Sequence, residues 1–449
     1  MSGEYEFGEV ISEGKTKVVR AVKGNKDLVV IKNKDDITAH DDPSFTKQFG
    51  TKARSSTETT CRVFELLAKT GLRVAYVEQL SPTEFLAKRC KMIPLEAVAR
   101  RYAVGSFLKR HPEMENSEIP YRFEKLYCEF FLKTAKGIVS PVEGEPVDLG
   151  LNSLKGEEDP LIVDVYSEKW DLFHSKKPAW DKEADLSKEV SSNLVLASSC
   201  SEAFIARMED LLRKTFLVLE GAWANLALRL IDMKIEFGLS PNGRIVIADV
   251  IDNDSWRLRT QKWEELSKQV FRDGGDLGLI EENYQFVAGL SAQLRIPEGQ
   301  VLVLWRGSKK DLFPEFPSKE AINLIRTGLF AFEKVTLSGH KSTRDCLDKL
   351  NRLISDYPRG GVIVAKVGRS NGLGPILAAH TTWPVLAIPA TLDCFPEDIW
   401  SNIRMPSNVP LMTVWPEANA MEAALNILAQ QGNPALYAHQ QYEMEKRLA

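Results

Sequence analysis

The sequence has few of the features on which metal centres, disulfide frameworks and membrane spans depend. Its six cysteines and six histidines are scattered over 449 residues, with neither a CxxC pair nor an HExxH segment. This spacing argues against a zinc site and a disulfide framework, and it is typical of a reducing compartment. No apolar run reaches the about 18 residues of a membrane span, and the N-terminus lacks the apolar core of a signal peptide. We therefore expect a cytoplasmic protein.

The chain also lacks an excess of positive charge. Its 58 Lys and Arg residues face 62 Asp and Glu residues, for a net charge of −4. No nucleic acid or membrane surface is therefore expected as a partner, and a local basic cluster is expected to bind a small anion. Hydrophobic residues make up 44% and charged residues 27%, which is typical of a globular protein.

The length predicts two domains. We place a first domain at 1–275, a linker helix at 276–298 and a second domain at 299–449. In the first domain, short strands surround a helix that ends near Gly71, which suits a helix C-terminus. Residues 137–186 are turn-rich and predict a surface insertion, and 187–229 have the apolar spacing of a long helix.

The second domain has strands of a different kind. VLVLW, FEKVTL, GVIVAKV and PVLAIPA are short and almost wholly apolar, as strands buried on both faces of a parallel sheet are. Helical segments separate them, so we predict a doubly wound α/β domain. In such a domain, ligands bind at the carboxyl ends of the strands.

Polar residues and glycines follow three of these strands. They are Ser308 and Asp311 after the first, Ser338, His340 and Lys341 after the second, and Arg369, Ser370 and Gly372 after the third. Glycine permits close backbone approach, N–H groups, Ser and Arg bind anions, and His exchanges protons near neutral pH. Together they predict a site for a phosphorylated ribose that carries a base. The alternative is that each glycine loop is only a tight strand-to-helix connection.

Two segments of the first domain carry alternating charges. EGKTK places Lys15 and Lys17 on one face of a hairpin, and DMKIEFG places Lys234 and Glu236 on one face of a strand. The alternatives are an exposed basic hairpin and an ordinary half-exposed strand.

Two further segments of this domain suit a ligand. Asp249 follows a buried strand, where a carboxylate suits Mg²⁺. Arg100 and Ser106 flank Gly105 in MIPLEAVARRYAVGSFLKR. The alternatives are that the later Asp252 and Asp254 are turn formers, and that the arginines are exposed on a helix.

The motifs of residues 299–449 resemble those of the class II aminoimidazole ribonucleotide (AIR) carboxylases, which need no ATP or biotin. GSKKDL, SGHKS, GRSNGLGP and PATLDCFPEDIWSNIRMPS carry this resemblance. It implies a flavodoxin-like fold and a site of Ser308, Asp311, Ser338, His340, Lys341, Arg369, Ser370 and Gly372. His340 would handle the proton on the imidazole carbon, and Lys341 would stabilise the incoming carboxylate. Three segments differ from the sequence that is usual in this family: GSKKD, SGHKST and AAHT.

Residues 8–275 resemble the ATP-dependent SAICAR synthetases, which join aspartate to carboxyaminoimidazole ribotide. EGKTK, KDDITAHD, MIPLEAVARRYAVGSFLKR, DMKIEFG and DVIDNDSWRL carry this resemblance. It implies an α+β domain in which ATP is bound by Lys15, Lys17, Met92, Glu96 and Lys234. It implies Mg²⁺ on Glu236 and Asp249, and ribotide binding by Asp36, Arg100, Ser106, Arg257, Lys268 and Arg272. The family's two aspartates near residue 134 are missing, and acidic Glu157–Asp159 appears only after the insertion.

The order of the two halves resembles the bifunctional enzymes of de novo purine synthesis in animals. That resemblance implies the substrates AIR, CO₂, L-aspartate and ATP, and an octamer built on the carboxylase domains. Two alternatives remain open on the sequence. The second half has lost catalysis and serves oligomerisation, or both halves form a nucleotide-binding regulator.

Overall fold

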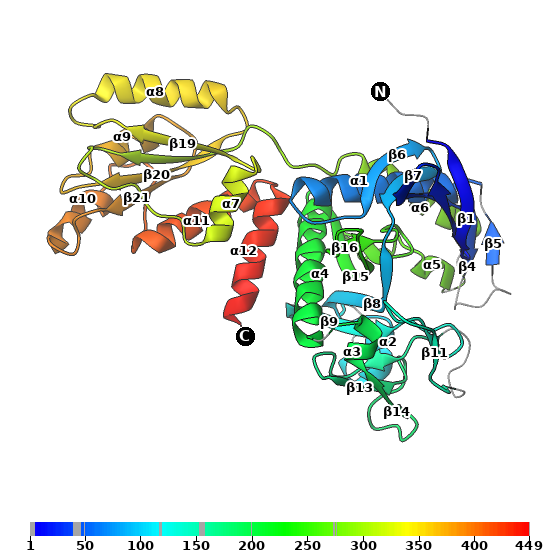
Figure 1. Cartoon of the computed structure of the whole chain (residues 1–449). Helices are drawn as coiled ribbons and strands as arrows, with labels where there is room; N and C mark the ends of the chain where they lie inside the picture. Colours follow the sequence, from blue (N-terminus) through cyan, green and yellow to red (C-terminus); the bar gives the residue numbers. More distant parts are fainter. Residues whose placement is uncertain are drawn as a thin grey trace. The chain divides into compact units, whose positions relative to one another are not determined.

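The computed structural model describes residues 5–38, 46–48, 50–115, 119–151, 158–198, 200–272, 274 and 276–448. The chain divides into two compact units (Figure 1). The first runs to Leu294 and takes in the residues from Glu445 on, and the second is Arg295–Met444. The segment expected as a linker supplies helix α6 (Leu277–Ser291) to the first unit. Among the described helices, none combines the length and apolar character needed to cross a membrane.

A five-stranded antiparallel sheet begins the first unit, in the order β1-β2-β3-β7-β6. Its strands are β1 (Phe7–Glu13), β2 (Lys17–Val22), β3 (Asn25–Asn33), β6 (Tyr76–Ser81) and β7 (Glu84–Lys88). The hairpin predicted around EGKTK is confirmed, since β1 pairs with β2, and β2 pairs in turn with β3. The EGKTK turn joins β1 to β2, and β4 (Asp36–Thr38) pairs with β5 (Thr46–Gln48) in a separate hairpin.

The second sheet of this unit has eight strands, in the order β14-β13-β12-β9-β8-β15-β16, with β17 also paired to β15. They are β8 (Lys91–Tyr102), β9 (Arg122–Leu132), β12 (Leu161–Ile162), β13 (Lys169–Phe173), β14 (Asp185–Ser191), β15 (Leu228–Leu239), β16 (Ile245–Ala248) and β17 (Trp256–Thr260). The small pair β10 (Ile138–Val139) and β11 (Val147–Asp148) lies apart from it. β8 and β15 are antiparallel neighbours at its centre.

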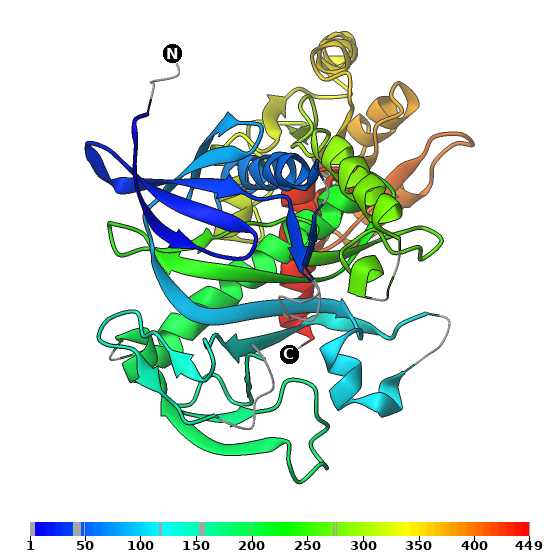
Figure 2. The same cartoon turned by 90° about the vertical axis from the view of Figure 1, so that its right-hand side faces the viewer.

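Three long helices pack on these sheets. α1 (Lys52–Lys69) and α6 lie side by side, and α4 (Ser201–Ala224) lies against β15 and β8 (Figure 2). The predicted end of α1 is confirmed, because Gly71 follows it with φ of 85°. The short helices are α2 (Ser106–Arg110), η2 (Pro112–Met114), α3 (Ser192–Leu196) and α5 (Gln269–Arg272).

Two expectations for this unit are wrong in part. Residues 187–229 are not one helix, because β14 continues to Ser191, whose side chain caps α3, and β15 begins at Leu228. The segment 137–186 is more than a surface insertion. Its strands β12 and β13 extend the second sheet, and Trp170 is 0% exposed.

The second unit is the predicted doubly wound domain. Its strands are β18 (Val301–Arg306), β19 (Ala331–Thr336), β20 (Gly361–Val367), β21 (Val385–Pro389) and β22 (Leu411–Thr413), all paired in parallel. The order β19-β18-β20-β21-β22 is that of flavodoxin-like sheets, so the predicted fold class is confirmed.

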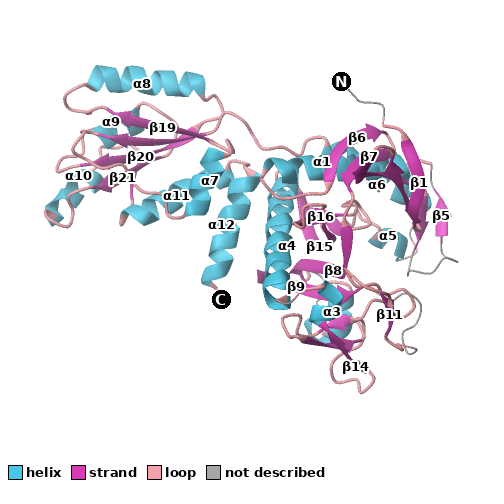
Figure 3. Cartoon of the chain, viewed as in Figure 1, coloured by secondary structure: helices cyan, strands magenta, loops and turns pink. Residues whose placement is uncertain are grey.

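Helices cover both faces of this parallel sheet (Figure 3). On one face Val303 and Trp305 of β18 pack with α8 (Thr343–Asp356) and α9 (Leu373–Ala379). On the other face Leu302 and Leu304 pack with α7 (Lys319–Arg326) and α11 (Glu417–Gln430). The remaining helices are η3 (Pro396–Ile399), α10 (Trp400–Ile403) and α12 (Pro434–Arg447).

Candidate active sites

A lysine and an aspartate from different sheets meet in the first unit. Lys17 begins β2, Asp249 follows β16, and their side chains form an ion pair. Asp249 has φ of 64°, a left-handed conformation that turns the chain at the end of the buried strand. The contact therefore joins the EGKTK hairpin to the carboxylate predicted as a magnesium ligand.

Strand β15 brings two more predicted residues to this cluster. Lys234 forms an ion pair with Glu96 of β8, which lies opposite Glu236 in the β8–β15 register. Glu236 pairs with Lys133, which follows β9, at 2.6 Å. The sequence predicted no role for Lys133, although it stands in the segment that precedes the insertion.

The pKa values of this cluster reflect its burial. Desolvation lowers the pKa of Lys17 to about 8, partly against the attraction of Glu236. Desolvation by itself would raise the pKa of Glu236, but Lys133 and Lys17 hold that pKa below its ordinary value. The Glu236 carboxylate therefore stays ionised beside several ammonium groups. A ligand that brings negative charge together with a divalent cation would pair with the ammonium groups and with the carboxylates of this cluster.

Protein side chains alone provide no complete metal site here. In the described ranges, no three or more His, Cys, Asp or Glu residues form a group that could hold an ion. Glu236 and Asp249 still offer two carboxylates near Lys17. Mg²⁺ is commonly held by one or two carboxylates together with nucleotide phosphates and water. The pair therefore fits Mg²⁺ that arrives with a nucleotide.

Asp159 also faces this cluster, although the sequence predicted no role for it. It accepts a hydrogen bond from Thr134 N–H at 2.8 Å. Burial and the nearby charge of Glu96 raise its pKa to about 7, against the hydrogen bond from Thr134 and the charges of Lys133 and Lys234. The acidic run at residues 157–159, inside the segment 137–186, was the available signal. Because β12 pairs with β9, Asp159 lies beside Thr134.

Asp159→Asn is expected to raise the thermal stability of the first unit at pH 8 and to change it little near pH 4. Folding raises the pKa of Asp159 from 3.8 to about 7. Its favourable contribution therefore exists below the lower value and is lost as the pH rises through the higher one. Melting temperatures of variant and wild type should diverge as the pH rises from 4 to 8. A constant difference would contradict the burial of this carboxyl group.

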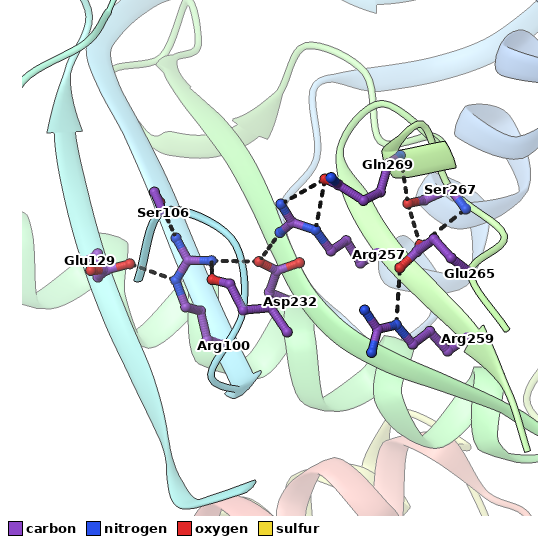
Figure 4. A network of polar contacts seen from close by, with 10 residues as sticks. Arg100, Ser106, Glu129, Asp232, Arg257, Arg259, Glu265, Ser267 and Gln269 are labelled. Atoms are coloured by element: carbon purple, nitrogen blue, oxygen red, sulfur yellow. Dashed lines mark hydrogen bonds and ion pairs between the residues drawn. The ribbon is translucent and has the colours of Figure 1, made fainter. Parts of the chain in front are cut away.

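A second cluster contains the predicted phosphate-binding residues (Figure 4). Arg100 of β8 donates to Glu129 of β9 and to Asp232 of β15, at 2.6 Å each, and to the Ser106 hydroxyl at 3.0 Å. Arg257 of β17 reaches the same oxygen of Asp232 at 2.5 Å. Arg100 is 3% exposed, so the alternative of exposed helix arginines is wrong for this residue.

The backbone fits closely around these guanidinium groups. A Cβ on Gly105 would lie 2.5 Å from Nη2 of Arg257, and Gly105 has φ of 61°, so this position favours glycine on both counts. Glu129 also pairs with Arg110, whose pKa burial lowers to about 10. Three arginines thus share the two carboxylates Asp232 and Glu129, which leaves a positive charge for an anion.

Glu129→Gln is expected to raise the KM for the ribotide and to lower stability by about 3 kcal/mol, because a buried charge pair is broken. Glu129 is 5% exposed and fixes both Arg100 and Arg110. Glu189→Gln is a matched control, since Glu189 pairs with Lys169 at the surface, where ion pairs contribute under about 1 kcal/mol. Steady-state kinetics and thermal melting check both variants. An unchanged ribotide KM would contradict the assignment.

Three other predicted ribotide residues lie apart from this network or outside the described side chains. Lys268 pairs with Asp254 at 3.5 Å, and buried Lys52 approaches the same oxygen at 3.2 Å. Asp36 accepts a hydrogen bond within the β4–β5 hairpin. Arg272 ends α5, and its side chain lies outside the described part of the chain.

Lys15 and Met92 were predicted to contact ATP. Lys15 is half-buried in the turn between β1 and β2. Met92 is 42% exposed near the start of β8, which begins at Lys91. Its exposed thioether leaves apolar surface for a ring to cover.

In the second unit the predicted residues follow the carboxyl ends of three adjacent parallel strands, β19, β18 and β20. Ser308 and Asp311 follow β18, and the Ser308 hydroxyl accepts from Lys310 N–H at 3.1 Å. Ser338 follows β19, and its hydroxyl accepts from Lys341 N–H at 3.3 Å. These hydroxyl groups and the side chains of Lys310 and Lys341 are solvent-accessible, so an anionic substrate can reach them.

His340 lies against the glycine loop that follows β20. A Cβ on Gly372 would lie 2.2 Å from Nε2 of His340, and a Cβ on Gly339 would lie 2.8 Å from the Gly372 carbonyl oxygen. The imidazole therefore occupies the space that a side chain at position 372 would fill. This contact brings the residues that follow β19 and those that follow β20 into one site.

Gly372→Ala is expected to displace the His340 imidazole and to lower carboxylation about 100-fold, as misplacement of a reacting group by about 1 Å does. The measurement is ATP-free carboxylation by the variant. Gly368→Ala is the matched control, because nothing lies within 4 Å of a Cβ there. Equal activity of the two variants would contradict the proposed position of His340.

Arg369 and Asn371 tie this loop to the segment after β21. The Arg369 guanidinium lies 3.9 Å from the centre of the Phe395 ring. Buried Asn371 donates to Asn402 Oδ1 at 2.8 Å and accepts from Gly374 N–H at 2.8 Å. The glycine loop is thus braced on one side by α10 and on the other by His340.

Comparison with known proteins gives the family. The SAICAR synthetase family matches residues 10–148 and 176–289, and the AIR carboxylase family matches 301–447. A Caenorhabditis elegans protein described as "Probable multifunctional protein ADE2" is 35% identical over 434 residues, 94% of this chain and 90% of that protein. This chain belongs to the bifunctional AIR carboxylase/SAICAR synthetase family.

Two relatives have both activities in their descriptions. The bifunctional phosphoribosylaminoimidazole carboxylase/phosphoribosylaminoimidazole succinocarboxamide synthetases of Drosophila melanogaster and Homo sapiens are 34% and 32% identical. They cover 94% and 93% of this chain, and the chain covers 89% of each. The chain is therefore a bifunctional enzyme of purine biosynthesis, with a SAICAR synthetase domain followed by an AIR carboxylase domain. The gap in the synthetase match falls inside the segment 137–186.

Proposed function

We propose that the synthetase domain activates the carboxylate of carboxyaminoimidazole ribotide with ATP and joins it to L-aspartate. The observation that carries this proposal is the cluster of Lys17, Lys133 and Lys234 with Glu96, Glu236 and Asp249. A carboxylate is a poor electrophile, so a carboxylate oxygen first attacks the γ-phosphorus and ADP leaves. The aspartate amine then attacks the acyl carbon, and phosphate leaves.

The residues of the cluster have separate parts in this reaction. Lys17 and Lys15 bind phosphates, Lys234 stabilises the charge on the transferring group, and Met92 and Glu96 line the adenine. Glu236 and Asp249 hold Mg²⁺, which neutralises phosphate charge when bound. Positioning and electrostatic stabilisation supply most of the catalysis of phosphoryl transfer.

The ribotide phosphate is held by the second cluster. Arg100, Arg257 and Ser106 converge there, and Asp232 and Glu129 keep both guanidinium groups in place. Asp36, in the substrate loop, and Lys268 and Arg272, in the segment that completes this domain, supply further ribotide contacts. A bound phosphate replaces part of the carboxylate pairing, so the cluster changes partners without exposing its charges.

The carboxylase domain adds CO₂ to AIR without ATP. The imidazole carbon attacks CO₂, a carbon–carbon bond forms, and His340 takes the proton from that carbon. Lys341 stabilises the new carboxylate, and Ser308, Asp311, Ser338, Arg369 and Ser370 bind the ribose phosphate. The packing of His340 on Gly372 supports a working carboxylase over a domain kept only for oligomerisation.

We propose a cytoplasmic octamer built on the carboxylase domains. The six cysteines are free thiols, which suits a reducing compartment. Trp400 and Ile403 of α10 are 49% and 50% exposed, and Trp415 is 47% exposed. Exposed apolar groups on neighbouring elements of one domain support contact between subunits.

An isotope experiment tests the synthetase mechanism. Ribotide labelled with ¹⁸O in its carboxylate is incubated with the full chain, ATP, Mg²⁺ and aspartate. Attack by the carboxylate transfers one labelled oxygen to the released phosphate. Unlabelled phosphate with full product formation would exclude the acyl phosphate, and phosphate release without aspartate-dependent product would argue for a regulator.

A further inference from the structure

A groove on the first unit lies outside both proposed sites. Its volume is about 390 Å³, within the range of small-molecule pockets. Three cations line it, Arg73, Lys88 and Arg244, against the single carboxylate of Asp27. The lining is thus positive by two charges, in a chain whose net charge is −4.

The donors of this groove are accessible. Arg73, Lys88 and Arg244 are all exposed, and over the described ranges neither arginine has a carboxylate partner. Within the same described ranges, the Lys88 ammonium donates only to the Val74 carbonyl oxygen, at 3.2 Å. The floor carries apolar side chains, including Leu28 and Val246. Several cationic donors around an apolar floor suit a phosphate group attached to a small organic body.

The groove touches the connection between the two sheets. Lys88 ends β7 of the first sheet, Lys91 begins β8 of the second, and β8 carries Met92 and Glu96. Arg73 lies at a second connection between the two sheets, because its carbonyl oxygen accepts a hydrogen bond from Ile247 N–H of β16 at 2.9 Å. Arg244 belongs to the turn between β15 and β16, two strands that also carry or precede proposed ATP ligands.

We propose that this groove binds a phosphorylated small molecule and that its occupancy changes the affinity of the synthetase domain for ATP. A ligand held by Lys88 and Arg244 restrains the connection from β7 of the first sheet to β8 of the second. The spacing between Lys17 on the first sheet and Glu236 on the second then depends on that ligand. The effect on ATP rests on the proposed function, and binding in the groove does not.

The test uses inorganic pyrophosphate as the probe, in calorimetric titrations of the full chain saturated with ADP and Mg²⁺. Arg73→Gln/Arg244→Gln is compared with Arg207→Gln/Arg352→Gln, which removes the same charge from two exposed arginines elsewhere. We expect the groove variant to bind pyrophosphate about tenfold more weakly or not at all, since charged phosphate contacts are lost. The control variant should bind as wild type does.

Two results would overturn the proposal. One is equal pyrophosphate binding by wild type and the groove variant, and the other is equal weakening in both variants. The KM for ATP is measured with and without pyrophosphate in the same proteins. A groove that binds the probe with no change in that KM refutes the link to ATP. Failure of ADP to bind wild type refutes the proposed function instead, and melting curves show whether each variant is folded.

Discussion

Asp249→Asn is expected to lower ATP-dependent ligation at least about 100-fold, because one of the two carboxylates that would hold Mg²⁺ at the transferring phosphate is lost. Asn adopts the left-handed backbone that Asp249 requires, with φ of 64°, so the turn should form normally. The variant keeps the size of the side chain and loses its negative charge. Ligation is measured with saturating ribotide and aspartate at several Mg²⁺ concentrations.

The same preparation provides the control for Asp249→Asn. Its ATP-free carboxylation of AIR should equal that of wild type, because residue 249 belongs to the first unit and His340 to the second. Equal loss of both activities would show that the two sites are not separate. Full ligation by the variant would remove Asp249 from the catalytic site.

His340→Asn is expected to have the opposite effect. Carboxylation should fall about 100-fold to 10,000-fold, the usual contribution of a general acid or base. Asn retains a polar group beside Gly372 but cannot exchange a proton near neutral pH. The rate is measured with AIR and bicarbonate in the absence of ATP.

His380→Asn serves as the matched control for His340→Asn. His380 is also exposed in the second unit, and its Nδ1 lies 2.8 Å from the Ile376 carbonyl oxygen. It should retain most of the carboxylation, whereas ligation should be normal in both variants. Carboxylation by His340→Asn at the wild-type rate would remove His340 from the catalytic site, whereas absence of carboxylation in wild type would support the alternative in which this domain serves only oligomerisation.

The sequence predicted best those features that depend on short-range patterns. Uniformly apolar strands predicted the parallel sheet, and the alternation in DMKIEFG predicted that Lys234 and Glu236 share a face of β15. The alternation follows from the two-residue period of a strand, and the uniform apolarity follows from burial on both faces of a parallel sheet. The end of α1 at Gly71 was predictable for a similar reason, because a left-handed residue after a helix favours glycine.

Contacts that depend on strand pairing were not predictable. Glu129 reaches Arg100 only because β9 pairs with β8, and Asp159 reaches the cluster of Lys133, Lys234 and Glu96 only because β12 pairs with β9. The packing of His340 on Gly372 joins the ends of β19 and β20, which are separated by β18 in the sheet. Each contact joins residues whose separation in sequence carries no periodic signal.

We infer that one chain holds two independent sites for the same ribotide. Equilibrium titration of the full chain with carboxyaminoimidazole ribotide, without ATP, counts these sites. We predict two molecules per chain, with one lost in Arg100→Gln and the other in Arg369→Gln. One molecule per chain in wild type, or a single variant that removes both, would contradict the account.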